Sequence, residues 1–337
     1  MKRFYVILSF IVPIIIAAGE LTIAAVGDIM PANTFNEDKF PAENGKYLFT
    51  DALEILQNAD IAIGNLECAL LDTGQTRKDT TKGTVYVFRT PEVYARTLKE
   101  TGFDAMNLAN NHARDFGDYG LERTKLMLDS AGIQYTGFPG RLAGYRKGDI
   151  TIAVIGFSVY HGMNNLTDIE KSSSIIEDLN EQYDIIIVTF HGGMESRDTL
   201  HTADTTEYYY GENRGNIVKF SRAVIDAGAD LVIGHGPHVP RAMEIYKDRL
   251  IAYSLGNFLT YTNVNTRGIA GYAPLLTVTL ADNGSFIEGK IHSFYQKKWH
   301  GVRHDSSNSA FNLIKKLSLE DFPNSAPNFT DNNKFLK

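Results

Sequence analysis

The chain has 337 residues, of which 43% are hydrophobic and 22% are charged, a composition typical of a globular protein with a sizeable core. Its formal charge is −7, from 33 basic and 40 acidic residues, and no run of more than two basic residues occurs, so we expect no nucleic-acid partner. Cys68 is the single cysteine, which excludes a scaffold held by internal disulfides.

The N-terminus has the layout of a secretory signal. Lys2 and Arg3 precede an apolar stretch at 4–18, which ends in small residues up to Gly19. We therefore expect residues 1–19 to be a cleaved signal peptide and the protein to be exported to the periplasm or the cell surface. The alternative is that the segment remains as a membrane anchor, although about fifteen apolar residues is short for a membrane span.

Apolar, strand-like segments alternate with helical ones along the chain, which predicts an α/β fold. Buried strands are expected at 21–26, 61–63, 105–109, 149–157, 184–190 and 230–233, and helices at 49–59, 91–101, 118–131, 172–182 and 216–227. Residues 85–89 alternate like a further strand, and hairpin turns are expected at 247–248 and 282–284.

The C-terminal part is expected to hold a helix at 310–317 followed by a loose, Asn-rich tail. We therefore divide the chain into the signal at 1–19, one domain at 20–300, and a C-terminal helix and tail at 301–337.

Five strand ends carry polar side chains of the kinds that bind metals, and most have a glycine beside them. Because open α/β sheets bind ligands at the carboxyl ends of their strands, we expect these side chains to meet in one crevice. They are Asp28, Glu67, Asn111 with His112, His191, and His235 with His238.

Each of these residues alone has an alternative interpretation as a helix cap or a polar turn residue. In series they favour a metal site, because a buried carboxylate or imidazole needs a partner and a shared metal supplies one. Oxygen and nitrogen ligands without a thiolate suit Mn²⁺, Fe or Zn²⁺. Six candidate groups suffice for two metals with a bridging carboxylate, an arrangement that serves phosphoryl-type displacement.

The motifs at these strand ends resemble those of the CapA-type poly-gamma-glutamate capsule biosynthesis family, over about residues 21–258. That family is similar to the calcineurin-like metallophosphoesterases, which implies a single-domain, four-layer α/β/β/α sandwich with a dinuclear metal site. The matching stretches are Gly27-Asp28-Ile29-Met30, Gly64-Asn65-Leu66-Glu67, 108–117 with Asp115 and Gly117, 191–195, 234–239 and 253–258.

The resemblance implies a role for each matching residue. Asp28, Asn111, His191 and His238 would be metal ligands, and His112 would protonate a leaving oxygen. Glu67 stands where the metallophosphoesterases have a bridging Asp. His235 lies one place before the other histidine of the Gly-His-x-His motif. Met30 stands where those enzymes have a histidine ligand, so one ligand of the usual set is absent.

Four further residues are candidates for the same crevice, each with an ordinary alternative. Glu195 is a candidate acid, base or ligand, or else a solvated loop carboxylate. Arg214 and Arg241 suit binding of a carboxylate or phosphate, although arginines are common on protein surfaces. Asn257 follows a strand and a glycine, and either lines the crevice or forms a turn.

The resemblance implies an exported, metal-dependent hydrolase of phosphoester type in poly-gamma-glutamate capsule biosynthesis. Its expected substrate is polyanionic, either poly-gamma-glutamate or a phosphate ester, and a membrane synthase complex is the expected partner. The alternative function is a non-catalytic protein that binds the polymer or helps to assemble its export machinery on the same fold.

Overall fold

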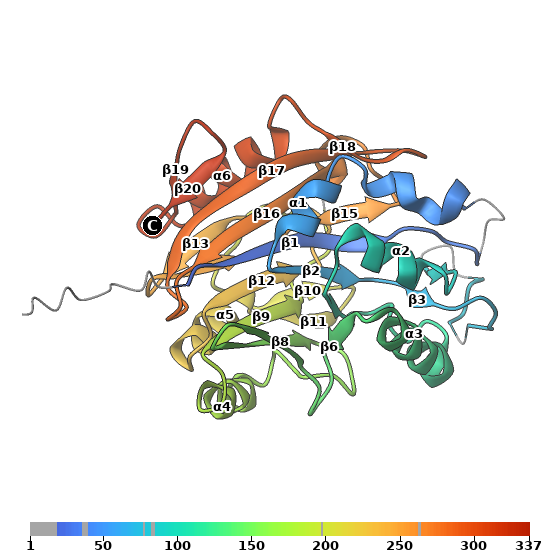
Figure 1. Ribbon diagram of the computed structural model, residues 1–337, viewed down its shortest axis with the longest axis horizontal. Helices are drawn as coiled ribbons and strands as arrows, with labels where there is room; N and C mark the ends of the chain where they lie inside the picture. The colour runs from blue at the N-terminus through green and yellow to red at the C-terminus, as the bar shows by residue number, and fades with distance from the viewer. Residues whose placement is uncertain (1–18, 36–39, 77, 82–84, 197, 262–263) are drawn as a thin grey trace, which may run out of the picture.

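Two β-sheets lie face to face at the centre of the fold, and helices cover their outer faces (Figure 1). The computed structural model describes residues 19–35, 40–76, 78–81, 85–196, 198–261 and 264–337. The expected signal segment at 1–19 lies outside the described residues except for Gly19. Within the described residues, no helix has both the length and the apolar character needed to cross a bilayer.

The larger sheet combines a parallel half with an antiparallel half. Strands β1, β2, β5 and β6 are parallel neighbours, and β16 and β17 continue the sheet antiparallel on the other side of β1. In spatial order the strands are β19 (Asn328–Phe329), β20 (Lys334–Leu336), β17 (Phe286–Lys297), β16 (Tyr272–Leu280), β1 (Leu21–Met30), β2 (Ile61–Leu66), β5 (Ala105–Asn107) and β6 (Gln134–Thr136), with β15 (Asn257–Thr260) on β1 and β18 (Gly301–His304) on β17.

The smaller sheet has parallel strands at its centre and an antiparallel pair at each edge. Its order is β13 (Met243–Tyr246), β14 (Arg249–Ala252), β12 (Leu231–His235), β9 (Ile185–His191), β8 (Ile150–Ser158) and β7 (Ala143–Lys147). Two short ribbons lie apart from both sheets. They pair β3 (Ala69–Leu70) with β4 (Arg89–Thr90), and β10 (Glu207–Tyr209) with β11 (Glu212–Gly215).

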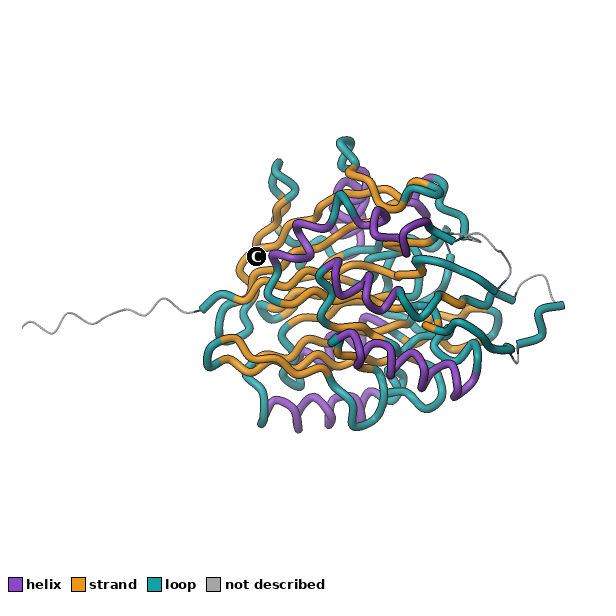
Figure 2. The backbone as a smooth tube through the Cα atoms, turned by 45° about the vertical axis from the view of Figure 1, so that its right-hand side comes forward, coloured by secondary structure: helices purple, strands orange, loops and turns teal. Residues whose placement is uncertain are grey.

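Helices form the outer layers of the sandwich (Figure 2). Leu56, Leu98 and Leu128 of α1, α2 and α3 pack in one apolar cluster with the outer face of the larger sheet. Ile176 and Val224 of α4 and α5 pack on the smaller sheet. The helices are η1 (Ala42–Phe49), α1 (Leu53–Asn58), α2 (Tyr94–Thr101), α3 (Gly117–Ala131), α4 (Ile169–Asn180), α5 (Ile217–Asp226), η2 (Gly268–Gly271) and α6 (Ser309–Asp321).

The side chains of strand β1 alternate between two apolar clusters, one on each face of the larger sheet. Leu21, Ile23 and Ala25 belong to the apolar cluster between the sheets, whereas Ala24 and Val26 belong to the cluster under α1, α2 and α3. Because successive side chains of a strand point to opposite faces, one strand contributes to two cores and must be apolar throughout. The expected four-layer α/β/β/α sandwich is confirmed by this arrangement of helices and sheets.

A glycine contact sets the position of β1 against the loop before β15. A Cβ added to Gly27 would lie 1.9 Å from the carbonyl oxygen of Gly256, so no larger residue fits there. The next amide, that of Asp28, donates a hydrogen bond of 2.9 Å to the same oxygen. The close approach therefore fixes where the Asp28 side chain leaves the strand.

Three local predictions differ from the structure. The helix expected at 49–59 begins only at Leu53, because 42–49 form the separate turn η1. Of the strand expected at 85–89, only Arg89 is paired, because its partner strand β3 is two residues long. The tail is not loose, since β20 pairs with β17 and β19 pairs with β20.

The core between the sheets should be the most sensitive part of the fold to truncation. Leu231 of β12 is fully buried there, so Leu231→Ala should lower the free energy of unfolding by about 2–5 kcal/mol. Leu126→Ala is the matched control, because Leu126 of α3 is 49% exposed and should change stability by less than about 0.5 kcal/mol. Urea denaturation measures both changes, and equal losses for the two variants would contradict the assignment of this core.

Candidate metal centre

The polar residues at the strand ends meet at one edge of the two sheets. Asp28 lies near the end of β1, and Glu67 directly follows β2. His191 and His235 are the last residues of the neighbouring strands β9 and β12, where they face each other in register. Asn111 and His112 lie in the turn between β5 and α3. The parallel strands thus bring together side chains that are far apart in the chain.

Asp28 is fully buried and holds three partners. Its Oδ1 accepts a hydrogen bond of 2.8 Å from Asn65 Nδ2 and lies 3.5 Å from His235 Nδ1. Its Oδ2 lies 2.9 Å from His238 Nδ1. Burial opposes ionisation of Asp28, but contacts with His235 and His238 outweigh it and hold the pKa of this carboxyl below its ordinary value. Asp28 is therefore a carboxylate in the protein.

Glu67 lies among three imidazole nitrogens without a hydrogen bond to any of them. Its Oε1 is 4.0 Å from His112 Nε2, 3.9 Å from His191 Nε2 and 3.8 Å from His238 Nε2. These distances are too long for hydrogen bonds. They match the separation of two ligands on one cation, since each metal–ligand bond is about 2.0–2.2 Å long.

Buried side-chain atoms without hydrogen-bond partners indicate that the centre is suited to binding a cation. Among the described residues, six buried side-chain atoms here have no hydrogen-bond partner. They are Oε1 and Oε2 of Glu67, Oδ1 of Asn111, Nε2 of His191, and Nδ1 and Nε2 of His235. Leaving such atoms unpaired costs about 1–3 kcal/mol each, and a divalent cation would satisfy several at once. The oxygen and nitrogen donors therefore fit the expected metal.

Asp28, Glu67 and His191 form the tightest of these groups, with one ligand atom from each lying within 4.8 Å of the others. Burial, reinforced by the Asp28 charge, raises the pKa of Glu67 well above its ordinary value. A bound cation would reverse this effect, because a cation stabilises the carboxylate form. Without a positive charge, burying these carboxyl groups together therefore destabilises the fold, whereas a bound cation would stabilise their ionised form.

His238 completes the ring of imidazoles from the loop after β12. Its backbone has a φ of 60°, a left-handed conformation that is uncommon outside glycine and is concentrated at functional sites. Burial lowers the pKa of His238, but the Glu67 charge and contacts with Asp28 and Glu195 dominate and raise it well above its ordinary value. Asn257 Oδ1 lies 3.1 Å from His238 Nδ1 and supports the ring from β15.

His112 is oriented by a buried carboxylate. Its Nδ1 lies 2.8 Å from Asp115 Oδ2, and this acceptor selects the tautomer in which Nδ1 carries a proton. Nε2 is then the ring atom that faces the centre. Burial lowers the pKa of His112, although the Asp115 carboxylate opposes that shift. Lys78 contacts the other oxygen of Asp115 from the loop before β4.

Glu195 and Arg214 form a buried pair beside the centre. Arg214 Nη1 lies 2.8 Å from Glu195 Oε1, while Glu195 Oε2 lies 3.7 Å from His238 Nε2. Burial raises the pKa of Glu195, but contacts with His238 and Arg214 dominate and lower it to about 2. Glu195 is therefore ionised at neutral pH and belongs to the centre instead of to a solvated loop.

The two arginines expected to bind substrate are both paired with carboxylates of the protein, although Nε and Nη2 of Arg214 and Nε of Arg241 have no hydrogen-bond partner. Arg241 donates to both oxygens of Glu207, at 2.8 and 2.9 Å, and to the Met194 carbonyl oxygen. Arg214 pairs with Glu195 and Glu212. These contacts fasten the β10–β11 ribbon to the smaller sheet, so the placement favours a structural role for Arg241 over direct substrate binding.

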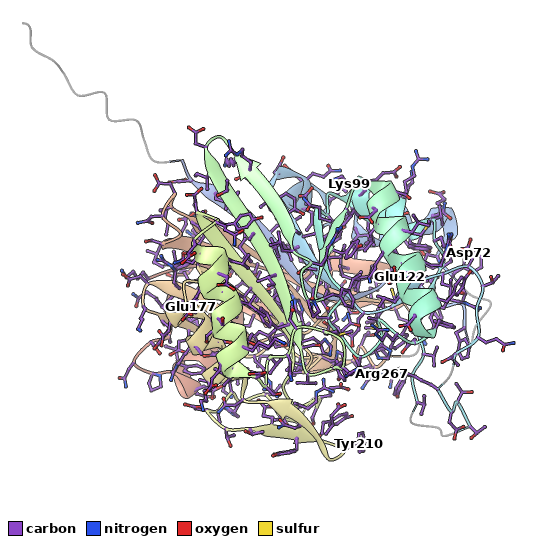
Figure 3. The ribbon with its side chains drawn as sticks, turned by 90° about the horizontal axis from the view of Figure 1, so that it is seen from below. Asp72, Lys99, Glu122, Glu177, Tyr210 and Arg267 are labelled. Carbon is purple, nitrogen blue, oxygen red and sulfur yellow. The ribbon has the colours of Figure 1, made fainter. Side chains whose placement is uncertain are left out.

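A cavity of about 420 Å³ opens onto the centre. His112, Glu195, His238 and Asn257 reach it, and so does Met30, which is almost fully buried. Figure 3 shows Tyr210, at the tip of the β10–β11 ribbon, and Arg267 toward the same edge of the molecule. The other lining residues are Tyr86, Phe88, Ser196, Tyr209, Pro237, Val239, Val264, Asn265 and Ala270.

The structure adds three residues to which the sequence analysis gave no role. Asn65 donates to Asp28 and lies 3.3 Å from His191 Nδ1, so it links two ligands. Its signal was its position two residues before Glu67, which puts both side chains on one face of the strand. Asp115 was noted only as part of a motif. Nothing in the sequence around Glu207 indicated a role for it, because its partner, Arg241, lies 34 residues away.

Comparison with known proteins gives consistent relatives. A family model described as bacterial capsule synthesis protein PGA_cap matches residues 22–262. The capsule biosynthesis protein CapA of Bacillus anthracis is 25% identical over 284 residues, covering 80% of this chain and 66% of that protein. The PGA biosynthesis protein CapA of Bacillus subtilis (strain 168) is 28% identical over 256 residues, covering 71% of this chain and 63% of that protein.

The chain thus spans slightly less than two thirds of the length of these two relatives. Among solved structures, Haemophilus influenzae NAD nucleotidase aligns with a TM-score of 0.45 and 14% identity, covering 89% of this chain and 56% of that one. A likeness of this degree carries no argument about the chemistry of this chain.

Metal binding should depend on Glu67. Saturating Mn²⁺ or Zn²⁺ should raise the melting temperature of the full chain by several degrees, because a ligand at about 100 times its Kd stabilises by about 2.7 kcal/mol. Glu67→Gln should remove most of that shift, since the amide cannot supply two anionic ligand atoms. Glu122→Gln on the exposed face of α3 is the control and should keep it.

Thermal melts with metal and with a chelator measure the shift, and elemental analysis gives the metal content. An undiminished shift in Glu67→Gln, with normal metal content, would contradict a metal centre at this position.

Proposed function

Because the chain belongs to the bacterial capsule synthesis protein PGA_cap family, we propose that it is an exported, metal-dependent hydrolase of phosphoester-type bonds that acts in poly-gamma-glutamate capsule biosynthesis. The observation that carries the catalytic part is the set of six buried side-chain atoms without hydrogen-bond partners, beside which His112 and His238 line a cavity. The capsule part is supported by the names of the relatives, two of which are CapA proteins.

The donors around Asp28 and Glu67 would hold one or two divalent cations. When bound, such a cation would supply Lewis-acid stabilisation of the charge that develops on the phosphoryl oxygens. Asp28, ionised and fixed by Asn65, and the unpaired oxygens of Glu67 are placed to neutralise the cation charge. His191 and His235 offer neutral nitrogens from the smaller sheet, so each sheet supplies part of the centre.

His112 is the proposed proton donor to the leaving oxygen. His112 gives this proton as the imidazolium, in which Asp115 holds the Nδ1 proton and the ring in place, and Nε2 carries the proton directed at the centre and at the cavity. Glu195 is a poor proton donor, because its lowered pKa of about 2 keeps it ionised at neutral pH. Its proposed role is to accept a proton or to hold His238 from the side of Arg214.

A second candidate function is a non-catalytic protein that holds the polymer or assembles its export machinery. Met30 favours this function, because its thioether lines the cavity near the end of β1, where the metallophosphoesterases have a histidine ligand. A thioether is a weak ligand for the hard cations that carboxylates prefer. The two candidate functions require the same fold and differ in whether the protein turns over a phosphoester.

Export and polymer association complete the proposal. The basic residues Lys2 and Arg3 followed by the apolar stretch at 4–18 support export. Association with a membrane synthase of the polyanionic polymer would place the hydrolase where the polymer emerges. The catalytic proposal concerns residues of this chain and can be tested on this chain alone.

Turnover should depend on His112. With Mn²⁺-loaded protein and a generic aryl phosphomonoester or phosphodiester, His112→Ala should lower kcat by about 10²- to 10⁴-fold, because the leaving oxygen loses its proton donor. Asp115→Asn should lower kcat less, since the ring remains but its tautomer is no longer fixed. His201→Ala is the matched control, because His201 is exposed and pairs with Asp321.

Steady-state kinetics and metal content are measured on the same preparations. Turnover that survives His112→Ala with full metal content would contradict the proton-donor role. Metal-loaded protein that binds poly-gamma-glutamate tightly but turns over no phosphoester would favour the second candidate.

A further inference from the structure

A series of aromatic rings leads from the mouth of the cavity to His112. Tyr86 and Phe88 line the cavity, whereas Val87 between them belongs to a separate buried cluster. The Tyr86 and Phe88 rings stack with centroids 6.3 Å apart and planes 20° apart. Phe88 in turn lies 4.4 Å from the His112 ring. We call Tyr86 and Phe88 the aromatic wall.

The aromatic wall is fastened to the carboxylate that orients the proton donor. Asp115 Oδ2 accepts a hydrogen bond of 2.8 Å from the Phe88 amide, and the same oxygen lies 2.8 Å from His112 Nδ1. Phe88 is almost fully buried, whereas Tyr86 is 53% exposed and presents its ring at the mouth. The wall therefore has a fixed position relative to His112 Nε2.

The remaining lining of the cavity is apolar or uncharged away from the metal centre. Met30, Pro237, Val239, Val264 and Ala270 line it, and no lysine or arginine does so among the described residues. The two nearby arginines, Arg214 and Arg241, do not line the cavity and are paired with Glu195, Glu212 and Glu207. Away from the centre itself, the described residues that line the cavity offer no cation to a second anionic group of a ligand.

We propose that the substrate of this centre is a phosphoester whose leaving group carries an uncharged, planar ring, and that Tyr86 and Phe88 bind this ring. The inference rests on the proposed hydrolase function. Because His112 gives its proton to the leaving oxygen, the group attached to that oxygen must lie next to His112. The aromatic wall is what lies there.

The hydrolysis balances without a further reactant. A water oxygen forms the new bond to phosphorus, and the bond from phosphorus to the leaving oxygen breaks with its electron pair remaining on that oxygen. The imidazolium of His112 supplies its Nε2 proton to the leaving oxygen, and the proton released by the water restores the imidazolium. The ring leaves as part of the alcohol and is released through the mouth beside Tyr86.

The experiment compares three alkyl phosphates whose leaving alcohols are of similar acidity, so that intrinsic reactivity changes little. Mn²⁺-loaded full chain is assayed with benzyl, cyclohexylmethyl and ethyl phosphate. Stacking on an aromatic side chain is worth about 2- to 10-fold, so kcat/KM should be higher by that factor for benzyl phosphate than for either of the others. Cyclohexylmethyl phosphate separates planarity from apolar bulk.

Variants of Tyr86 then test whether the preference for benzyl phosphate comes from the aromatic wall. Tyr86→Ala should bring the ratio of kcat/KM for benzyl and ethyl phosphate toward one, and Tyr86→Phe should retain it, because the ring and not the hydroxyl is used. Tyr86 is exposed, so its truncation leaves the core intact. Tyr119→Ala, which removes an exposed tyrosine of α3 that does not line the cavity, is the control and should keep the ratio.

A fourth ester tests charge. Benzyl phosphate with a carboxylate on the ring should be a poorer substrate than benzyl phosphate, and a preference for it would overturn the inference. Equal turnover of benzyl and ethyl phosphate, or a ratio unchanged by Tyr86→Ala, would overturn the inference and leave the hydrolase function standing. Failure to hydrolyse any of the four esters would overturn the hydrolase function and the inference with it.

Discussion

Buried lone pairs without partners are the constraint on which the rest of this structure depends. Glu67 and His235 direct atoms into a space where the protein offers them no donor, and each such atom would weaken a fold that has no cation to fill the gap. The neighbouring Asp28 remains a carboxylate and offers a negative charge to a cation there. The two sheets therefore hold apart groups that a divalent cation would draw together, and the apolar core behind them supplies the stability that this requires.

The sandwich makes that arrangement possible because its parallel strands end at one edge. Asp28 comes from the larger sheet, while His191 and His235 come from adjacent strands of the smaller one. Each strand reaches the edge through an apolar run, so the carboxylate and imidazole groups meet at the boundary of two dry cores. The close approach of Gly27 to Gly256 adds precision, since it fixes the point at which Asp28 leaves its strand. Ligand geometry is thus set by backbone packing more than by side-chain choice.

Much of this could be predicted from the sequence, because the signals are local. An apolar run that ends in a glycine and a polar residue predicts both the strand and the side of the sheet where Asp28 and Glu67 lie. The remainder depends on contacts between distant segments. The bond from the Phe88 amide to Asp115 spans 27 residues, and β20 is a short segment whose order comes from its partner β17. Arg241 shows what the sequence could not predict. An arginine is suited to binding an anionic ligand, but in the fold Arg241 pairs with Glu207.

Asp115 contacts both the ring of His112 and the backbone amide of Phe88, in the segment that also carries Tyr86. Whatever displaces that segment also loosens the histidine, and whatever steadies the segment steadies the histidine. In the proposed hydrolase, recognition of the ligand by the aromatic wall and alignment of His112 as proton donor would therefore be thermodynamically linked through one oxygen atom. In such an arrangement a poorly fitting ligand is penalised in the rate of the chemical step as well as in affinity, so that discrimination between ligands takes place during reaction and not only at binding.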